Sequence, residues 1–290
     1  MEKQVKGVTK KVLLWNEAQV PPPMRTYSPS WRKPRLFVNM VKDLLPEYKI
    51  ELRKSGTASI DELMEVHAPE YVRGVLQGTV ANGFGVRSAE VAKSFLYTTG
   101  AIAEAVDLAL DTGATVCAPV SGFHHAEYEH GGGFCTFNGL MVAANRVLKR
   151  GKRPGVIDID AHYGNGTDNI MKEKGWTFPH YTFGGIDYAK QGKRLGLTEG
   201  EAFLRDLPLI LQRFVNCDVV LYQAGADPHI DDPLGGSLTT MQMMERDKLV
   251  FDYFKRHKIP VVWNLAGGYQ EPVTKVLDLH LNTLRIWGNT

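Results

Sequence analysis

The stretch GVIDIDAHYGNG, residues 155–166, joins a short apolar run to alternating ionisable residues and two closely spaced glycines. A continuous β-branched run of this length is typical of a strand buried on both faces, as in a parallel sheet covered by helices. The glycines and polar residues after it indicate a turn into the next helix. The stretch therefore predicts one strand of a parallel α/β sheet, with ionisable side chains at its carboxyl end.

The same order of strand, glycine-containing loop and helix recurs along the chain. Similar apolar runs lie at residues 12–15, 114–120, 217–222 and 259–265. Helical spacing of apolar residues predicts helices over 35–45 and 97–110, and Gly113 is placed to end the second. Five prolines between residues 19 and 34 indicate an irregular loop there. Because no linker or repeat divides the chain, we expect one α/β domain over residues 1–290, with a central, mostly parallel sheet flanked by helices.

The composition disfavours several classes of protein. The chain has 290 residues, of which 43% are hydrophobic and 23% charged, which is globular and not disordered composition. Its 34 Lys and Arg nearly balance 32 Asp and Glu, so we expect no nucleic-acid or membrane-surface partner. Three widely spaced cysteines, a Lys-rich start without the apolar core of a signal peptide, and no bilayer-length apolar run predict a cytoplasmic protein.

Ionisable residues follow four of the predicted strands, at the sheet edge where parallel α/β proteins bind ligands. Asp160 and His162 are two positions apart, so both can point to the same side, and Asp227 follows the run at 217–222. Two carboxylates and one imidazole suit Zn²⁺ or another divalent transition metal, with room for water. The alternative is that Asp160 only caps a helix, but the nearby glycines and the separate Asp227 loop favour a metal site.

The adjacent histidines His124 and His125 lie in another of these loops. Two imidazoles beside a metal-activated water can supply a general base and a general acid near neutral pH. The alternative is that they are additional metal ligands. Such histidines need partners that fix their orientation, and Asp158 and Asn165 are available for that purpose.

Tyr269 follows two glycines after the last predicted strand, where its phenol could donate a hydrogen bond to a developing oxyanion. The alternative is a tyrosine that packs at a strand end. No Gly-x-Ser-x-Gly nucleophile motif occurs, and no cysteine spacing indicates a thiol nucleophile.

Five stretches together carry a family resemblance. They are GFHHA (122–126), GFCTFN (133–138), DIDAHYGNGT (158–167), QAGAD (223–227) with DPL (232–234), and GGY (267–269). In this order they resemble the zinc-dependent histone deacetylase family, with its bacterial acetylpolyamine amidohydrolase and acetoin-utilisation relatives. The resemblance extends from about Pro34 to the last predicted strand.

The resemblance implies an arginase/deacetylase-type fold and removal of an acyl group, acetyl in most of the family, from an N-acylated amine such as acetyl-lysine or an acetylpolyamine. By the family pattern one Zn²⁺ per chain would be held by Asp160, His162 and Asp227. The catalytic residues would be His124, His125, Tyr269, Asp158 and Asn165, with His125 as proton shuttle to the leaving amine. The substrate tunnel would be lined by Phe134 and Leu234.

The family also binds K⁺ through backbone carbonyls, here near residues 158–162. The implied mechanism is attack of metal-activated water on the amide, with the oxyanion stabilised by the metal and Tyr269 and no covalent intermediate. The nearest alternatives are an arginase-like binuclear metal hydrolase on the same fold and a non-catalytic protein that binds acyl ligands. A 2-His-1-carboxylate iron oxygenase is a more remote one.

The sequence departs from the family pattern in three places. Tyr163 stands where many members have a second histidine, and the segment 176–194 is short, with Tyr188 as a candidate for the second aromatic tunnel wall. The segment 82–85 has no acidic residue of the kind that holds a substrate backbone. We therefore predict neither the physiological amine nor the oligomeric state.

Overall fold

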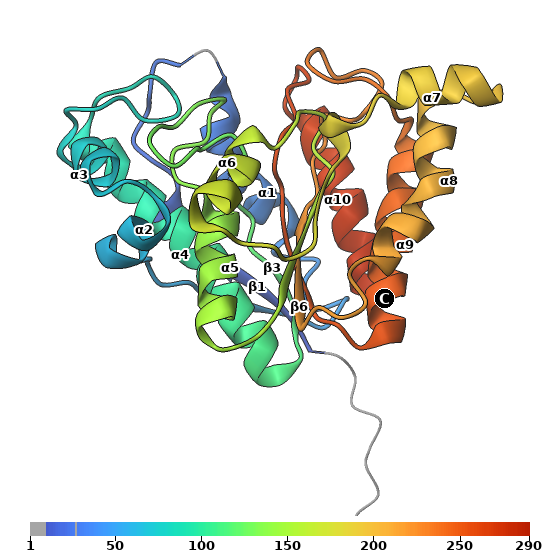
Figure 1. Cartoon of the computed structure of the whole chain (residues 1–290), viewed down its shortest axis with the longest axis horizontal. Coiled ribbons are helices and arrows are strands. Elements are labelled where there is room, and N and C mark those ends of the chain that lie inside the picture. Colours follow the sequence, from blue (N-terminus) through green and yellow to red (C-terminus); the bar gives the residue numbers. More distant parts are fainter. Residues whose placement is uncertain (1–9, 27) are drawn as a thin grey trace, which may run out of the picture.

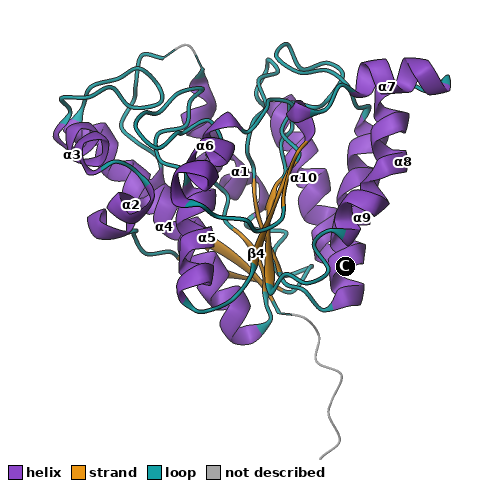
Figure 2. Ribbon diagram, viewed as in Figure 1, coloured by secondary structure: helices purple, strands orange, loops and turns teal. Residues whose placement is uncertain are grey.

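The computed structural model describes residues 10–26 and 28–290, so the predicted absence of a signal segment falls largely on residues outside the described part. Within that part, seven strands form one parallel sheet in the order β2-β1-β3-β7-β6-β4-β5. They are β1 (Lys11–Trp15), β2 (Ile50–Lys54), β3 (Thr115–Cys117), β4 (Pro154–Asp158), β5 (His180–Thr182), β6 (Val219–Gln223) and β7 (Val261–Asn264). The sheet lies between two layers of helices (Figures 1 and 2).

The helices divide between the two faces of the sheet, as the predicted α/β architecture requires. The α-helices are α1 (Lys33–Val41), α2 (Ile60–Val66), α3 (Pro69–Gln77), α4 (Ala89–Thr112), α5 (Gly139–Lys149), α6 (Asn165–Lys174), α7 (Tyr188–Leu195), α8 (Glu199–Gln212), α9 (Thr240–His257) and α10 (Thr274–Asn289). Short 3-10 helices are η1 (Glu17–Gln19), η2 (Pro29–Arg32) and η3 (Phe183–Gly185).

Each face of the sheet has its own hydrophobic core, because successive strand residues point to opposite faces. In β4, Val156 packs in the core formed with α2 to α6, whereas Ile157 packs in the core formed with α1 and α8 to α10. Both side chains are fully buried. Because β4 is buried on both faces of the sheet, its sequence is a continuous apolar run and does not alternate between apolar and polar residues.

The predicted elements are confirmed with altered bounds. Gly113 ends α4 in a left-handed conformation, and the proline-rich loop contains the short helix η2 before α1 begins. The strand predicted over 114–120 is regular only in β3. Sequence patterns missed β2 and β5, because β2 is a largely exposed edge strand and β5 has only three residues.

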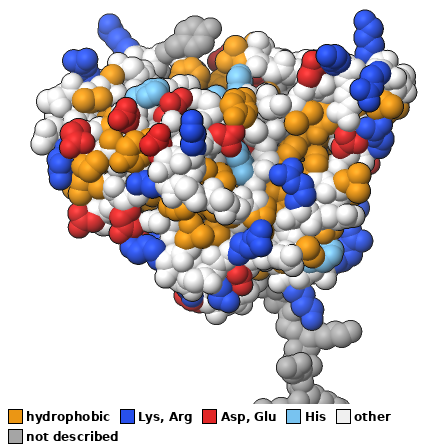
Figure 3. Space-filling model, viewed as in Figure 1, with side chains coloured by type: hydrophobic (Ala, Val, Ile, Leu, Met, Phe, Trp, Pro, Cys, Tyr) orange, Lys and Arg blue, Asp and Glu red, His pale blue; other side chains and the backbone are white. Residues whose placement is uncertain are grey.

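The four strands β3, β7, β6 and β4 are consecutive neighbours at the centre of the sheet. Because all of them run in the same direction, the loops that leave their carboxyl ends lie side by side at one edge. No helix in the described ranges is long and apolar enough to cross a membrane. On the face drawn in Figure 3, basic and acidic side chains are interspersed and neither sign forms a large field.

Candidate active site

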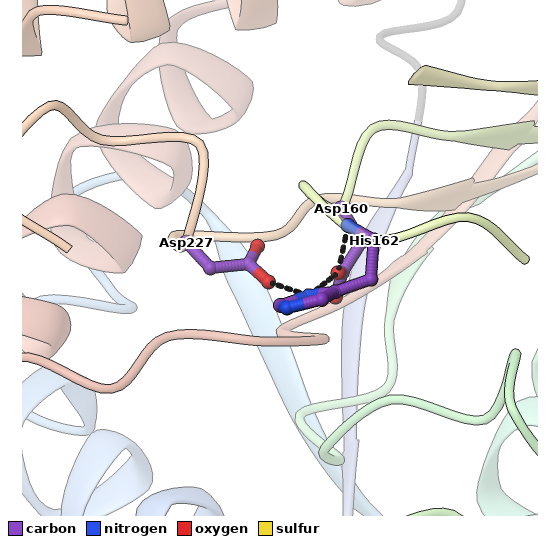
Figure 4. A group of neighbouring side chains, drawn as sticks. All are labelled: Asp160, His162 and Asp227. Atoms are coloured by element: carbon purple, nitrogen blue, oxygen red, sulfur yellow. Dashed lines mark hydrogen bonds and ion pairs between the residues drawn. The ribbon is translucent and has the colours of Figure 1, made fainter. Parts of the chain in front are cut away.

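Three side chains from two loops meet where β4 and β6 end (Figure 4). The ligand atoms of Asp160, His162 and Asp227 all lie within 4.8 Å of one another. His162 Nδ1 is 3.1 Å from Asp160 Oδ1 and 3.0 Å from Asp227 Oδ2. No other group of three or more His, Cys, Asp or Glu side chains with this geometry occurs in the described part of the chain.

The remaining carboxylate oxygens are held by the backbone. Gly267 N donates to Asp160 Oδ2 at 2.9 Å, and Ala161 N donates to Asp227 Oδ1 at 3.2 Å. Gly267 is required here, because a Cβ at this position would lie 2.4 Å from Asp227 Oδ2 and 2.6 Å from Asp160 Oδ2. The space beside both carboxylates is therefore kept open by the absence of a side chain.

The electrostatics of the three residues fit a bound cation. Burial and the neighbouring charge of Asp160 raise the pKa of Asp227, because two buried carboxylates lie side by side. Hydrogen bonds to these carboxylates raise the pKa of His162 to about 10. The carboxylate pair thus requires positive charge at this point, which a proton or a metal ion can supply. The donor set of two oxygens and one nitrogen can hold a divalent transition metal.

His124 is buried between this cluster and the end of β4. Its Nδ1 donates to Asp158 Oδ2 at 2.6 Å, and its Nε2 is 3.6 Å from Asp160 Oδ1. Gln223 Nε2 donates to the other Asp158 oxygen at 3.0 Å, so both oxygens of this buried carboxylate are bonded. Burial alone would lower the pKa of His124, but the charges of Asp158 and Asp160 outweigh it and raise the pKa to about 9. These carboxylates therefore favour the protonated form of His124.

His125 occupies a different environment although its ring lies only 4.1 Å from that of His124. Its Nδ1 is 2.6 Å from Oδ1 of Asn165, one of the two partners that the sequence offered for the histidines. Burial and the charge of His124 lower the pKa of His125, which keeps this imidazole neutral. The pKa values of the two adjacent histidines are thus shifted in opposite directions, as expected of one electrostatic and one proton-transferring group.

Tyr269 faces the cluster from the loop after β7, with its ring 6.2 Å from that of His162. Burial and the charges of Asp160 and Asp227 raise the pKa of Tyr269 above its usual range, so the phenol keeps its proton. The backbone N of Tyr269 donates to Asp232 Oδ2 at 2.8 Å, which fixes the position of this loop. The phenol is therefore a potential hydrogen-bond donor close to the ring of His162.

Lys33 is a component of the site that the sequence did not reveal. It begins α1 and is buried, and its Nζ donates to the carbonyls of Ala266 and Gly267, the latter at 3.1 Å. Burial lowers the pKa of Lys33 to about 8, although the carboxylates of Asp227 and Asp160 oppose this effect. In the sequence it looks like any lysine beside a proline, and only the tertiary structure brings it beneath the loop that carries Tyr269.

The expected tunnel residues lie on two sides of Tyr269. The ring of Phe134 is 5.8 Å from that of Tyr269, and the ring of Phe84 packs 5.7 Å behind Phe134. Leu234 is 43% exposed and lines a cavity of about 220 Å³ together with Tyr269. Phe134 also has a φ of 64°, an uncommon backbone conformation that in non-glycine residues tends to occur at functional sites.

The expectation for Tyr188 is wrong. This side chain is buried on the far side of the sheet edge, where its ring stacks 5.5 Å from Phe183 and its hydroxyl bonds Tyr181. It belongs to the core because Phe203 of α8 packs edge-on against both Tyr188 and Phe183. Tyr163 instead lies at the surface beside the metal cluster, 44% exposed, with its hydroxyl donating to Asp168.

A comparison with known protein families identifies the chain. The model of the histone deacetylase domain matches residues 30–179 and 198–284, which include every residue of the site described above. The chain belongs to the histone deacetylase family. The matched stretches contain all five motifs on which the resemblance rested.

Individual relatives are distant. The chain is 31% identical to an uncharacterized protein of Picosynechococcus sp. over 74% of this chain and 77% of that one. It is 30% identical to histone deacetylase 2 of Arabidopsis thaliana over 54% of this chain and 44% of the relative. It is 26% identical to the acetylpolyamine amidohydrolase of Mycoplana ramosa over 54% and 52%. The chain thus matches only about half the length of these two named relatives.

Solved structures support the fold. An acetylpolyamine aminohydrolase from Burkholderia pseudomallei superposes with a TM-score of 0.77 at 16% identity, covering 96% of this chain and 99% of that one. The HDA15 HD domain gives a TM-score of 0.73 at 18% identity over 97% and 88% of the two chains. The arginase/deacetylase-type α/β fold that the sequence motifs implied is confirmed.

Proposed function

We propose that this protein is a zinc-dependent amidohydrolase that removes an acyl group, acetyl in the simplest case, from an N-acylated amine such as acetyl-lysine or an acetylpolyamine. The observation that carries the proposal is the convergence of the Asp160, His162 and Asp227 cluster with a cationic imidazole, a neutral imidazole and a phenol. Membership of the histone deacetylase family supports this assignment. We infer that residues 1–290 form a single catalytic domain of this type.

The metal cluster would hold Zn²⁺ through Asp160, His162 and Asp227. When bound, such an ion acts as a Lewis acid toward the acyl carbonyl and acidifies water. The resemblance to the family also predicts a K⁺ ion on backbone carbonyls near residues 158–162. The K⁺ ion is a prediction from the family pattern. The cytoplasmic location is a prediction from the composition of the chain.

His125 performs the proton transfers. With Nδ1 donating to Asn165, its Nε2 carries the free lone pair and accepts a proton from the attacking water. The oxygen of that water bonds to the acyl carbon, and the carbonyl electrons move onto oxygen. The electrons on that oxygen then re-form the carbonyl as the carbon–nitrogen bond breaks, and His125 returns its proton to the amine nitrogen. The products are a free amine and a carboxylic acid, which loses its remaining proton to solvent at neutral pH.

Two other groups stabilise the negative oxygen formed in the first step. Tyr269 donates a hydrogen bond from its phenol, which its raised pKa keeps protonated. His124, held as a cation by Asp158, supplies positive charge without having to move a proton. Removing one such donor typically costs about 100- to 1,000-fold in kcat.

The test is release of free amine from a panel of acetyl-lysine peptides, acetylated polyamines and longer acyl-lysines, with zinc analysis of the same sample. We expect turnover that requires about one zinc per chain. His125→Ala should abolish turnover and retain zinc, because it removes the proton shuttle and no ligand. His257→Ala is the matched control, because this histidine is exposed at the end of α9.

The other outcomes contradict the proposal. Bound zinc without turnover of any amide favours the non-catalytic acyl-ligand alternative. Two metal ions per chain would favour the arginase-like alternative, which the single metal cluster in the described residues does not support. Full zinc occupancy in Asp227→Ala would show that the ligand set is wrong.

A further inference from the structure

The side chain of Asn165 is bonded at both ends. Its Oδ1 lies 2.6 Å from His125 Nδ1, and its Nδ2 lies 2.7 Å from Oε1 of Glu127. Asn165 is the first residue of α6, whereas Glu127 lies in the loop after β3, two residues beyond His125. Imidazole, amide and carboxylate therefore form a chain of three groups that begins at the proton shuttle and ends at a partly buried carboxylate.

The direction of these hydrogen bonds follows from the chemistry of the three groups. An ionised carboxylate only accepts, so the bond to Glu127 must use the NH₂ of the amide. The amide oxygen then faces His125, and Nδ1 of the imidazole must be the nitrogen that carries the proton. Glu127 thereby determines that Nε2 of His125 has the free lone pair.

The backbone around Glu127 holds this carboxylate in place. Its backbone N donates to the carbonyl of His130 at 2.9 Å, and its carbonyl is 2.8 Å from His67 Nδ1. The other nitrogen of the buried His67 accepts from Asn138 N at 2.9 Å, so His67 is a neutral donor to Glu127. The exposed His130 ring lies 3.8 Å from the second carboxylate oxygen and does not compete for the first.

We propose that Glu127 is a positioning residue for the reaction, which acts through Asn165 to fix the tautomer and orientation of His125. It touches neither the substrate region nor the metal cluster. The role rests on the proposed function, because a fixed tautomer matters only where His125 must accept a proton at Nε2.

The decisive experiment reverses the direction of the hydrogen bonds that link His125, Asn165 and residue 127. In E127K an ammonium, which only donates, replaces the acceptor, so the Asn165 amide turns round and presents its NH₂ to His125. The imidazole must then carry its proton at Nε2 and cannot act as base. We expect kcat to fall about 100-fold with little change in KM or in melting temperature.

Reciprocal rescue separates this role from a purely structural one. In N165D two carboxylates would meet at the position of the 2.7 Å contact, so kcat should fall. The double variant E127K/N165D places an ammonium beside a carboxylate whose other oxygen can accept from His125. It should recover at least about tenfold over either single variant.

Matched controls define the outcomes. E129K makes the same charge change at an exposed position in the same loop, and its kcat should stay near that of the starting enzyme. E127Q can either accept or donate, so it no longer fixes the direction of these hydrogen bonds, and its kcat should lie between those of E127K and the starting enzyme. If E127K proves unstable, E127L removes the acceptor without adding charge and should still lower kcat about tenfold. Equal kcat for E127K and E129K, or no rescue in the double variant, would overturn the proposal.

Imidazole ¹⁵N NMR of His125 reads the tautomer whether or not the protein turns over any amide. Suppose that the starting protein hydrolyses no amide, but that the proton of His125 still moves from Nδ1 to Nε2 in E127K. That result would support the positioning role of Glu127 while contradicting the proposed function. An unchanged tautomer in an active enzyme would overturn the role of Glu127 alone.

Discussion

Replacing Gly267 by alanine adds one methyl group at the most crowded point of the metal cluster. The new Cβ would lie 2.4 Å from Asp227 Oδ2, which is one of the two oxygens that contact His162 Nδ1. Ordinary van der Waals contacts begin at 3.4 Å. The backbone of Gly267 is outside the left-handed region, so alanine brings no backbone strain that would obscure this local effect.

The magnitude follows from the size of that overlap. To relieve it, the Asp227 oxygen or the loop must move by about 1 Å, several times the roughly 0.2 Å within which metal–ligand distances are held. Displacement of groups around a metal typically lowers affinity by about 10- to 100-fold. We therefore expect G267A to bind Zn²⁺ about 10- to 100-fold more weakly, or about 1.4 to 2.7 kcal/mol.

Zinc affinity is measured by competition with a chromophoric chelator, and melting temperature is measured on the metal-free protein. The matched control is G132A, because a Cβ at Gly132 meets nothing within 4 Å and its φ is not positive. G132A should bind zinc like the unaltered protein. If G267A also binds zinc with unaltered affinity while remaining folded, then Asp227 Oδ2 is not a ligand and the assigned metal site is wrong.

Three further predictions test other parts of the site. Y269F should lower kcat about 100- to 1,000-fold with KM nearly unchanged, measured by amine release, and an unaltered kcat would remove the phenol from the mechanism. K33M leaves the Ala266 and Gly267 carbonyls without their donor and should cost about 1 to 3 kcal/mol of unfolding free energy in urea titration. Burial lowers the pKa of His67 from 6.5 to about 4. Between pH 6.5 and pH 4 the imidazole is therefore protonated in the unfolded chain and neutral in the folded protein. Stability should therefore fall as pH drops from 6.5 toward 4, with His67 contributing up to about 1.4 kcal/mol per pH unit. A variant H67Q that shows the same pH slope would refute that contribution.

The three residues of the candidate metal site and their partners could be placed from the sequence because each lies in a short local pattern. Asp160 and His162 alternate at a strand end, and alternation alone places both on one side of the chain. Asp227 lies beside them because β4 and β6 are neighbours in the sheet. This placement was a reasonable expectation, since both runs were predicted to be parallel strands that end in similar loops. The sequence offered Asn165 as a partner that orients one of the two histidines, and its Oδ1 lies 2.6 Å from His125 Nδ1.

Lys33 and Glu127 could not be predicted in the same way. Both are charged residues in unremarkable local sequence, and their roles depend on contacts with segments far away or across a loop. The tunnel expectation for Tyr188 failed for a related reason. Its environment is decided by Phe203 of α8, which the local sequence around 188 does not contain.

The sequence by itself determined the α/β class, the edge of the sheet where the site lies and the identity of the three metal-cluster residues, because strand periodicity and chain direction are local properties. The tertiary structure alone decided the strand order, the opposite directions in which the pKa values of His124 and His125 are shifted, and the direction of the hydrogen bonds that link Glu127 to the imidazole. These properties depend on burial and on charges brought together from distant segments, and such distances do not exist until the chain has folded.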